Sequence, residues 1–250
     1  MTPSLDGKVA IVTGGASGLG RATCEALSAA GANVLVADVD ESGGREVAEA
    51  VDGAFHRTDV SRMEDNHAMV AAATERFGGV DLVHLNAGVS TGFGVDASFD
   101  VERYRHVMGV NLDGVVFGTH AVLDALTARG GGAIVATASL AGLTGVPFDP
   151  LYAANKHAVV GLARSLGPSL ADRGVRFNAV CPGFADSRII DDIREGLAQA
   201  GIPVIAAETV AGAVIELLTG DMTGECWFVQ AGREPAPFAF RNLPGPRVAG

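Results

Sequence analysis

The sequence predicts an α/β fold, in which a doubly wound parallel sheet of about seven strands is covered by helices on both faces. Short apolar, β-branched runs alternate with helical stretches along the chain, a pattern typical of successive βαβ units. The strand runs are almost continuously apolar, which indicates burial on both faces. The 34 glycines suit many tight strand-to-helix turns. No internal repeat or linker interrupts the pattern, so a single domain is expected over residues 1–250.

The expected elements follow in order from the period of the apolar residues. Strands are expected at residues 8–13, 33–37, 54–58, 81–85, 133–138, 175–180 and 225–229. Helices are expected at residues 21–30, 41–51, 61–77, 100–128, 151–172, 187–199 and 208–218. The stretch 232–250 is a proline-rich C-terminal tail, which cannot be helical and should either pack on the body or cross to another subunit.

Composition narrows the class of partner. Apolar residues make up 48% of the chain and charged ones 19%, which provides a core and excludes disorder. A net charge of −11 argues against nucleic acid and anionic membranes, because both need clustered Lys and Arg. The three cysteines are scattered and no metal-ligand spacing is present, so neither a disulfide framework nor a metal site is expected. Without a signal peptide or a long apolar span, a cytoplasmic protein is expected.

A glycine-rich turn between the first strand and the first helix predicts a dinucleotide site. Backbone free of side chains can approach a pyrophosphate, which then lies on the helix N-terminus. The spacing is G-x3-G-x-G and differs from G-x-G-x-x-G, and a merely tight turn is the alternative. The candidate residues are Gly14, Ser17, Gly18, Leu19 and Gly20.

Asp38 ends the second strand and predicts NAD as the cofactor. Its carboxylate can accept hydrogen bonds from the adenosine ribose hydroxyls and would repel the 2′-phosphate of NADP. No basic residue occupies positions 15–17 or 39–40, and Arg45 lies a helical turn or more away. The alternative is an exposed aspartate that caps the following helix.

Ser139, Tyr152 and Lys156 form the candidate catalytic group. Lys156 lies one helical turn after Tyr152, so the two side chains share a helix face, and the ammonium is expected to lower the tyrosine pKa below about 10. Such a tyrosine can exchange a proton near neutral pH. Ser139 follows the strand at 133–138, at the carboxyl edge where open α/β sheets bind ligands. By spacing alone, a strand-end serine and an ordinary Tyr–Lys pair remain the alternative.

Several motifs in the same order resemble the short-chain dehydrogenase/reductase family over about residues 6–230. They are TGGASGLG, Asp38, Asp59-Val60, Asn86-Ala87-Gly88, Asn111, Ser139, Tyr152-x3-Lys156 and Pro182-Gly183. The resemblance implies a single-domain Rossmann fold, NAD(P) binding, hydride transfer between nicotinamide and alcohols or ketones, and a homodimer or homotetramer.

By the same resemblance, Tyr152 is the acid/base and Ser139 steadies the substrate oxygen. Lys156 lowers the tyrosine pKa and holds the nicotinamide ribose, and Asn111 supports a water-linked proton relay. For Asn111, a residue that simply caps a break in the helix is the alternative. The adenine would lie between Asp59 and Val60. The cofactor would further contact Asn86, Ala87 and Gly88, and its carboxamide would lie near Pro182 and Gly183.

Three features depart from the family pattern. Leu85 stands where the first Asn of an Asn-Asn-Ala-Gly turn is usual, and the C-terminal tail replaces a Val-Asp-Gly-Gly ending. His84 lies in the same apolar strand, where a buried histidine is more often a satisfied core residue than a catalyst.

The substrate pocket is expected from residues 90–95, 140–149 and 184–200. These stretches supply the apolar residues Phe93, Leu140, Val146, Phe148, Phe184, Ile189, Ile190 and Ile193. Such a lining favours a neutral, apolar or aromatic secondary alcohol or ketone. Sugar, steroid or acyl-thioester oxidoreduction is the alternative within the family, and a non-catalytic NAD-binding scaffold is the alternative outside it.

Overall fold

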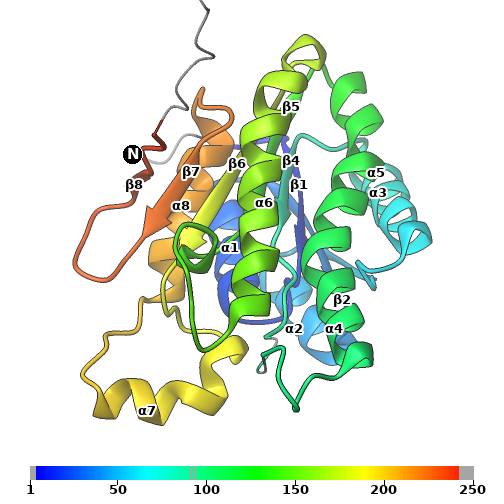
Figure 1. Ribbon diagram of the computed structural model, residues 1–250. Coiled ribbons are helices and arrows are strands. Elements are labelled where there is room, and N and C mark those ends of the chain that lie inside the picture. Colours follow the sequence, from blue (N-terminus) through cyan, green and yellow to red (C-terminus); the bar gives the residue numbers. More distant parts are fainter. Residues whose placement is uncertain (1–3, 91, 93, 242–250) are drawn as a thin grey trace, which may run out of the picture.

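The computed structural model describes residues 4–90, 92 and 94–241, and in that part an eight-stranded sheet runs through the centre (Figure 1). The strand order is β3-β2-β1-β4-β5-β6-β7-β8, and all neighbours are parallel except β7 and β8. The strands are β1 (Val9–Thr13), β2 (Asn33–Asp38), β3 (Ala54–Arg57), β4 (Leu82–Leu85), β5 (Gly132–Thr137), β6 (Val175–Pro182), β7 (Cys226–Val229) and β8 (Ala236–Pro237). The predicted doubly wound α/β fold is confirmed.

Helices connect the successive parallel strands from β1 to β7 and cover both faces of the sheet. The α-helices are α1 (Gly18–Ala29), α2 (Glu41–Ala50), α3 (Met63–Phe77), α4 (Val101–Met108), α5 (Gly114–Ala128), α6 (Pro150–Ser169), α7 (Arg194–Gln199) and α8 (Ala207–Thr219). Short 3₁₀ turns lie at Leu140–Gly142, Ala171–Arg173 and Arg188–Ile193, and one π-helical turn lies at Gly109–Asp113. In the part of the chain that the structure describes, no helix is long and apolar enough to cross a bilayer.

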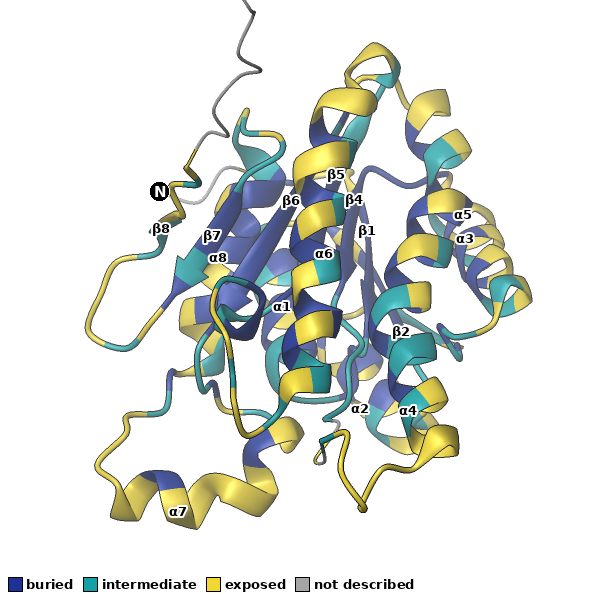
Figure 2. Ribbon diagram, viewed as in Figure 1, coloured by how far each residue is buried: buried dark blue, intermediate teal, exposed yellow. Residues whose placement is uncertain are grey.

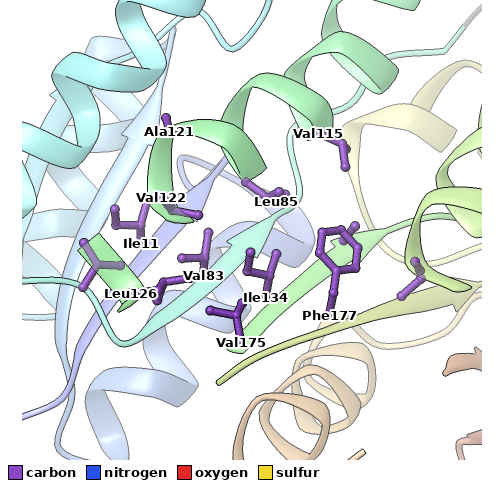
Figure 3. Close-up of a cluster of buried hydrophobic side chains, with 14 of the residues drawn as sticks. Ile11, Val83, Leu85, Val115, Ala121, Val122, Leu126, Ile134, Val175 and Phe177 are labelled. Atoms are coloured by element: carbon purple, nitrogen blue, oxygen red, sulfur yellow. The ribbon is translucent and has the colours of Figure 1, made fainter. Parts of the chain in front are cut away.

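The apolar strands bury two separate clusters, one on each face of the sheet. Residues of α3, α5 and α6 form the first cluster with one set of strand side chains (Figure 3). Helices α1, α2 and α8 form the second cluster with the alternate set. Strand alternation explains the division, because successive side chains point to opposite faces. The strands are buried along most of their length, whereas the helices expose their outer faces (Figure 2).

Strand order reverses at β1, which pairs with β2 on one side and β4 on the other. Chain segments leaving β1 and β4 therefore diverge to opposite faces, and a crevice opens at their carboxyl ends. All of the candidate catalytic and cofactor residues follow strands at this edge or lie on the helices that begin there.

Three elements differ from the predicted ones. The helix expected at 100–128 is divided by the π-helical turn at Gly109–Asp113, and the helix expected at 187–199 begins as a 3₁₀ turn. The described part of the tail packs on the body: β8 pairs antiparallel with β7, and the Arg164 guanidinium lies 3.9 Å from the centroid of the Phe240 ring. The spacing of apolar residues reveals neither the extra residue that makes a π-helical turn nor an edge strand of only two residues.

Candidate active site

A cleft of about 450 Å³ lies at the carboxyl edge of the sheet. Every predicted catalytic or cofactor residue lines it except Gly20 and Asn111. The predicted residues in its wall are Gly14, Ser17, Gly18, Leu19, Asp38, Asp59, Val60, Asn86, Ala87, Gly88, Ser139, Tyr152, Lys156, Pro182 and Gly183. The fold thus brings to one cavity residues that the sequence distributes from Gly14 to Gly183.

The glycine turn is close-packed, which explains its composition. Gly14 and Gly18 have φ of 64° and 50°, a region that favours glycine. A Cβ on Gly14 would lie 2.8 Å from Ala87 Cα, and one on Gly20 would overlap the Gly14 carbonyl. Gly20 is therefore beneath the turn, where it permits close packing, whereas Gly14 and Gly18 face the cleft.

Asp38 is oriented by two backbone amides. Its Oδ2 accepts a hydrogen bond from Ala16 N at 2.9 Å, and its Oδ1 accepts one from Asp40 N at 3.0 Å. Each carboxylate oxygen has a further lone pair for a ligand hydroxyl. Asp40, rather than Asp38, caps helix α2, since its Oδ1 accepts from Gly43 N at 3.0 Å. The capping alternative for Asp38 is thereby excluded.

The structure also brings a cation to this end of the cleft. Arg188 lines the cleft and donates from Nη2 to Asp40 Oδ2 at 3.1 Å. Positions 15–17 and 39–40 give no sign of this cation, because Arg188 follows β6 and reaches Asp40 across 148 residues of sequence. Its guanidinium is paired with a carboxylate here.

Helix α6 positions the tyrosine and the lysine. It begins because Asp149 Oδ1 accepts a hydrogen bond from Tyr152 N at 3.1 Å, and Pro150 occupies the first helical position. One turn separates Tyr152 from Lys156, and the Lys156 ammonium lies over the tyrosine ring, 5.6 Å from its centroid. The predicted shared helix face is confirmed.

The expected lowering of the tyrosine pKa is wrong for this arrangement. Burial raises the pKa of Tyr152 to about 12, a hydrogen bond with Ser139 acts in the opposite direction, and the Asp149 charge raises it further. Burial also lowers the pKa of Lys156 to about 8. The amine donates to Thr137 O at 2.9 Å and faces the ring, so it contributes less to the phenol than sequence spacing suggested.

Ser139 lies beyond the end of β5, and its hydroxyl is partly used by backbone groups. Oγ accepts from Ala141 N at 3.1 Å and donates to Pro182 O at 3.4 Å, a long and therefore weak bond. The hydroxyl can exchange that weak bond for one to a ligand oxygen. Ser139 and Tyr152 thus present two hydroxyls to the same part of the cleft.

Asn111 lies behind the cleft wall. It is fully buried in the π-helical turn, where its Oδ1 accepts from Val89 N at 2.8 Å and its Nδ2 donates to Val89 O at 2.9 Å. Both ends of the amide are thus occupied by the backbone N–H and C=O of one residue, Val89, in the loop that follows β4. The side chain holds this loop in place, and among the described residues its hydrogen bonds go to Val89 while the Lys156 ammonium donates to Thr137 O.

The predicted substrate wall is present in part. Ile189 and Ile190 line the cleft, but Phe148 points to solvent with 76% of its surface exposed, and Ile193 is 44% exposed. Leu140, Val146 and Phe184 are not among the residues that form this cleft. Phe93 lies outside the described residues. The apolar wall is therefore narrower than the sequence indicated.

Other cleft residues were not anticipated. They include Thr137, His106 and Val110, whereas Ser187 and Arg188 belong to the stretch 184–200 that was expected to line the substrate pocket. Thr137 lies two residues before Ser139, so strand alternation could have placed it on the same edge. His106 and Val110 come from α4 and the π-helical turn, whose distances from the sheet edge depend on helix packing.

Comparison with known proteins agrees with this geometry. Residues 8–198 match the sequence profile of the short chain dehydrogenase family. The chain is 43% identical over 182 residues to a 2,5-dichloro-2,5-cyclohexadiene-1,4-diol dehydrogenase of Sphingobium indicum, covering 72% of this chain and 73% of that protein. It is 33% identical over 223 residues to a cyclohexanol dehydrogenase of an Acinetobacter species, covering 84% and 89%.

Solved structures show the same fold. Levodione reductase superposes with a TM-score of 0.84 at 31% identity, covering 91% of this chain and 97% of that one. A short-chain type dehydrogenase/reductase from Mycobacterium marinum gives a TM-score of 0.85 at 26% identity, covering 92% and 96%.

Proposed function

Because this chain belongs to the short-chain dehydrogenase/reductase family, we propose that it is an NAD-dependent oxidoreductase that interconverts a cyclic secondary alcohol and its ketone. The observation that carries the proposal is the convergence of Ser139, Tyr152 and Lys156 on one wall of the cleft whose other end holds Asp38. The nicotinamide cofactor, when bound, supplies and accepts the hydride.

The glycine turn suits this cofactor. Added Cβ atoms at Gly14 and Gly20 would collide with the backbone of Ala87 and Gly14, so only glycine permits this tight turn, whose bare backbone fits a dinucleotide. Asp38 would hold the adenosine ribose and favour NAD over NADP. Asp59 and Val60 border the region for adenine, and Pro182 and Gly183 border the nicotinamide end.

The chain's own residues handle the proton. In alcohol oxidation Tyr152 Oη accepts the hydroxyl proton, and in ketone reduction it returns that proton to the oxygen. Ser139 Oγ donates a hydrogen bond to the same oxygen and stabilises its negative charge as it develops. Lys156, held by Thr137 O, supplies positive charge beside the phenol and a donor to the nicotinamide ribose. Asn111 acts indirectly, because its amide holds the backbone N–H and C=O of Val89 in place.

A cyclic substrate is supported by two observations. The relatives above are named for cyclic alcohols or diols, and the cleft offers Val89, Ile189 and Ile190 as apolar contacts near the hydroxyls. Few cations face the cleft, which disfavours phosphorylated and acyl-carrier substrates.

An oxidation assay tests the proposal. Cyclohexanol, a cyclohexanediol, a 3β-hydroxysteroid and an open-chain secondary alcohol are each offered with NAD and with NADP, and reduced cofactor is followed by its absorbance. With NAD, we expect faster turnover of cyclohexanol and the cyclohexanediol than of the steroid and the open-chain alcohol. The steroid tests the alternative that a 37% identical relative, the 3beta-hydroxysteroid dehydrogenase 2 of Eggerthella lenta, suggests. Absence of turnover with all four substrates, despite tight NADH binding, would favour the scaffold alternative.

We also propose a cytoplasmic homo-oligomer, a dimer or a tetramer. Cys24, Cys181 and Cys226 are free and buried, which suits a reducing compartment. Light scattering of the purified chain measures the assembly size.

A further inference from the structure

His84 is a fully buried polar residue in the middle of β4 that the proposed proton transfer does not involve. Its Nε2 lies 2.8 Å from Thr137 Oγ1 on the neighbouring strand β5. Its Nδ1 is buried with no hydrogen-bond partner among the described residues. The residue is thus only half satisfied, contrary to the expectation of a satisfied core histidine.

Backbone carbonyls determine the direction of every hydrogen bond around this histidine. Asn86 Nδ2 lies 3.1 Å from Thr13 O and 3.3 Å from Gly14 O. Since carbonyl oxygens only accept, this end of the Asn86 side chain is the NH₂ group. The Oδ1 end then faces Thr137 Oγ1 at 3.1 Å, so the threonine hydroxyl must donate to it.

A hydroxyl carries a single proton, and Thr137 has used its proton on Asn86. The histidine must therefore donate from Nε2–H to Thr137 Oγ1, which makes it the neutral tautomer with a bare Nδ1. The charge state agrees independently, because complete burial lowers the pKa of His84 to about 3. The direction of donation runs from His84 through Thr137 and Asn86 to the glycine turn.

The network connects the two ends of the proposed chemistry. Thr137 O is the acceptor that holds the Lys156 ammonium, at 2.9 Å. At the other end, a Cβ on Gly20 would lie 2.8 Å from Asn86 Nδ2, so the amide is fitted closely beneath the glycine turn. A change in the orientation of the Asn86 amide would move the Thr13 and Gly14 backbone, on which the pyrophosphate of the proposed cofactor would lie.

We propose that His84 is a positioning residue for the cofactor: its Nε2–H orients the Thr137 hydroxyl, which orients the Asn86 amide that holds the Thr13 and Gly14 carbonyls. The inference rests on the proposed function, because the turn is assigned to a nicotinamide dinucleotide. An aliphatic side chain would fill this core position without leaving Nδ1 unpaired, and an unpaired buried nitrogen is destabilising. A role limited to packing does not account for that cost.

Two nearly isosteric substitutions separate hydrogen bonding from packing. His84→Met removes the donor, and His84→Gln places an amide N–H near the position of Nε2. Leu82→Met is the matched control, because Leu82 lies on the same face of β4 in the same apolar cluster as its neighbours on β1 and β5. NADH binding is measured by fluorescence titration, alcohol KM by steady-state kinetics, and folding by thermal unfolding.

The expected result is a Kd for NADH about tenfold higher in His84→Met, within about twofold of wild type in His84→Gln, and unchanged in Leu82→Met. Alcohol KM at saturating NAD should change little in all three. Thr137→Val provides a second measurement if His84→Gln does not fold: adding His84→Met to it should weaken binding no further, because both substitutions break one network.

Equal NADH affinity in His84→Met and wild type would overturn the inference and leave the proposed function intact. Folded His84→Gln that binds as weakly as His84→Met, or additive effects of His84→Met and Thr137→Val, would also overturn it. Failure of the wild-type protein to bind NADH would instead refute the proposed function, and the positioning role would fall with it.

Discussion

Burial, more than mutual attraction, controls the acid–base behaviour of Tyr152 and Lys156. The pKa of the phenol is raised to about 12 and that of the amine lowered to about 8. Near pH 7 both side chains are therefore protonated, which prepares the protein to donate a proton to a ketone. Removing a proton from an alcohol requires the phenolate, and that form becomes populated only toward alkaline pH.

The two directions should therefore differ in their dependence on pH. Since kcat/KM reports the ionisations of the free enzyme, kcat/KM for alcohol oxidation is expected to rise between about pH 7 and pH 10. Ketone reduction needs the protonated phenol and is expected to change much less over that range. Initial rates in buffers of constant ionic strength measure both, and an oxidation optimum near pH 7 would contradict the assignment.

Removal of the phenol oxygen tests its role directly. Tyr152→Phe is expected to lower kcat by about 10²–10⁴-fold, the range for positioned acid–base groups, while the Kd for NADH stays within a few-fold of wild type. Tyr104→Phe is the control, since Tyr104 lies on α4 outside the cleft wall. A parallel loss of NADH binding in Tyr152→Phe would assign the phenol to cofactor binding instead.

The charge of Asp38 determines cofactor choice in this proposal. Asp38→Asn keeps an oxygen acceptor for the Ala16 or Asp40 amide and removes the negative charge. The preference for NAD over NADP should fall by about ten- to a thousand-fold, which corresponds to about 1–4 kcal/mol for two charges about 4 Å apart. The ratio of kcat/KM with NAD to kcat/KM with NADP measures this preference. An unchanged ratio in Asp38→Asn would mean that the charge does not discriminate between the two cofactors.

Among the elements, α6 carries the proposed acid/base Tyr152 together with Lys156, and one residue both begins the helix and affects its tyrosine. Asp149 caps the helix at the amide of Tyr152, and its charge raises the tyrosine pKa. The same carboxylate accepts from Gly92 N at 3.4 Å through Oδ2. Helix geometry and tyrosine acidity are therefore coupled at a single side chain.

Two substitutions at Asp149 distinguish these effects. Asp149→Ala should lower the free energy of unfolding by about 1 kcal/mol because the cap is lost, whereas Asp149→Ser retains a capping oxygen and should cost less. Both remove the charge, so both should shift the rise of alcohol oxidation to lower pH. Urea unfolding and the pH profile measure the two effects. If the pH profile shifts in Asp149→Ala but not in Asp149→Ser, the shift is caused by fraying of the helix and not by loss of the Asp149 charge.

At the scale of the whole molecule, the tail completes the sheet. Strand β8 pairs with β7, Phe238 N donates to Cys226 O at 2.8 Å, and Pro237 lies on the outer strand. An edge strand with a proline is a poor template for further strand addition, because proline lacks an N–H. The tail therefore protects the β7 edge from pairing with another chain.

Truncation tests this protective role. A chain ending at Gly232 lacks β8 and exposes the β7 edge, so it should form larger species in size-exclusion chromatography and unfold at lower temperature. A chain ending at Arg241 retains β8 and serves as the control. Identical elution and unfolding of the two truncated chains would show that the edge needs no cover.

The sequence alone was sufficient for features that depend on local spacing. The alternation of apolar strands and helices predicted the sheet, because burial on both faces requires that pattern. Glycine positions predicted the turn, and the four-residue interval between Tyr152 and Lys156 predicted their shared face. These properties follow from neighbouring residues whatever the rest of the chain does.

Only the tertiary structure decided features that depend on burial or on contacts between distant segments. The Arg188–Asp40 pair joins residues 148 positions apart, and the hydrogen bonds from His84 to Asn86 pass through Thr137 on the neighbouring strand β5. The pKa of Tyr152 moved opposite to the prediction, because desolvation by the surrounding protein raises it more than the hydrogen bond with Ser139 lowers it. Spacing along the chain contains no measure of either distance or desolvation.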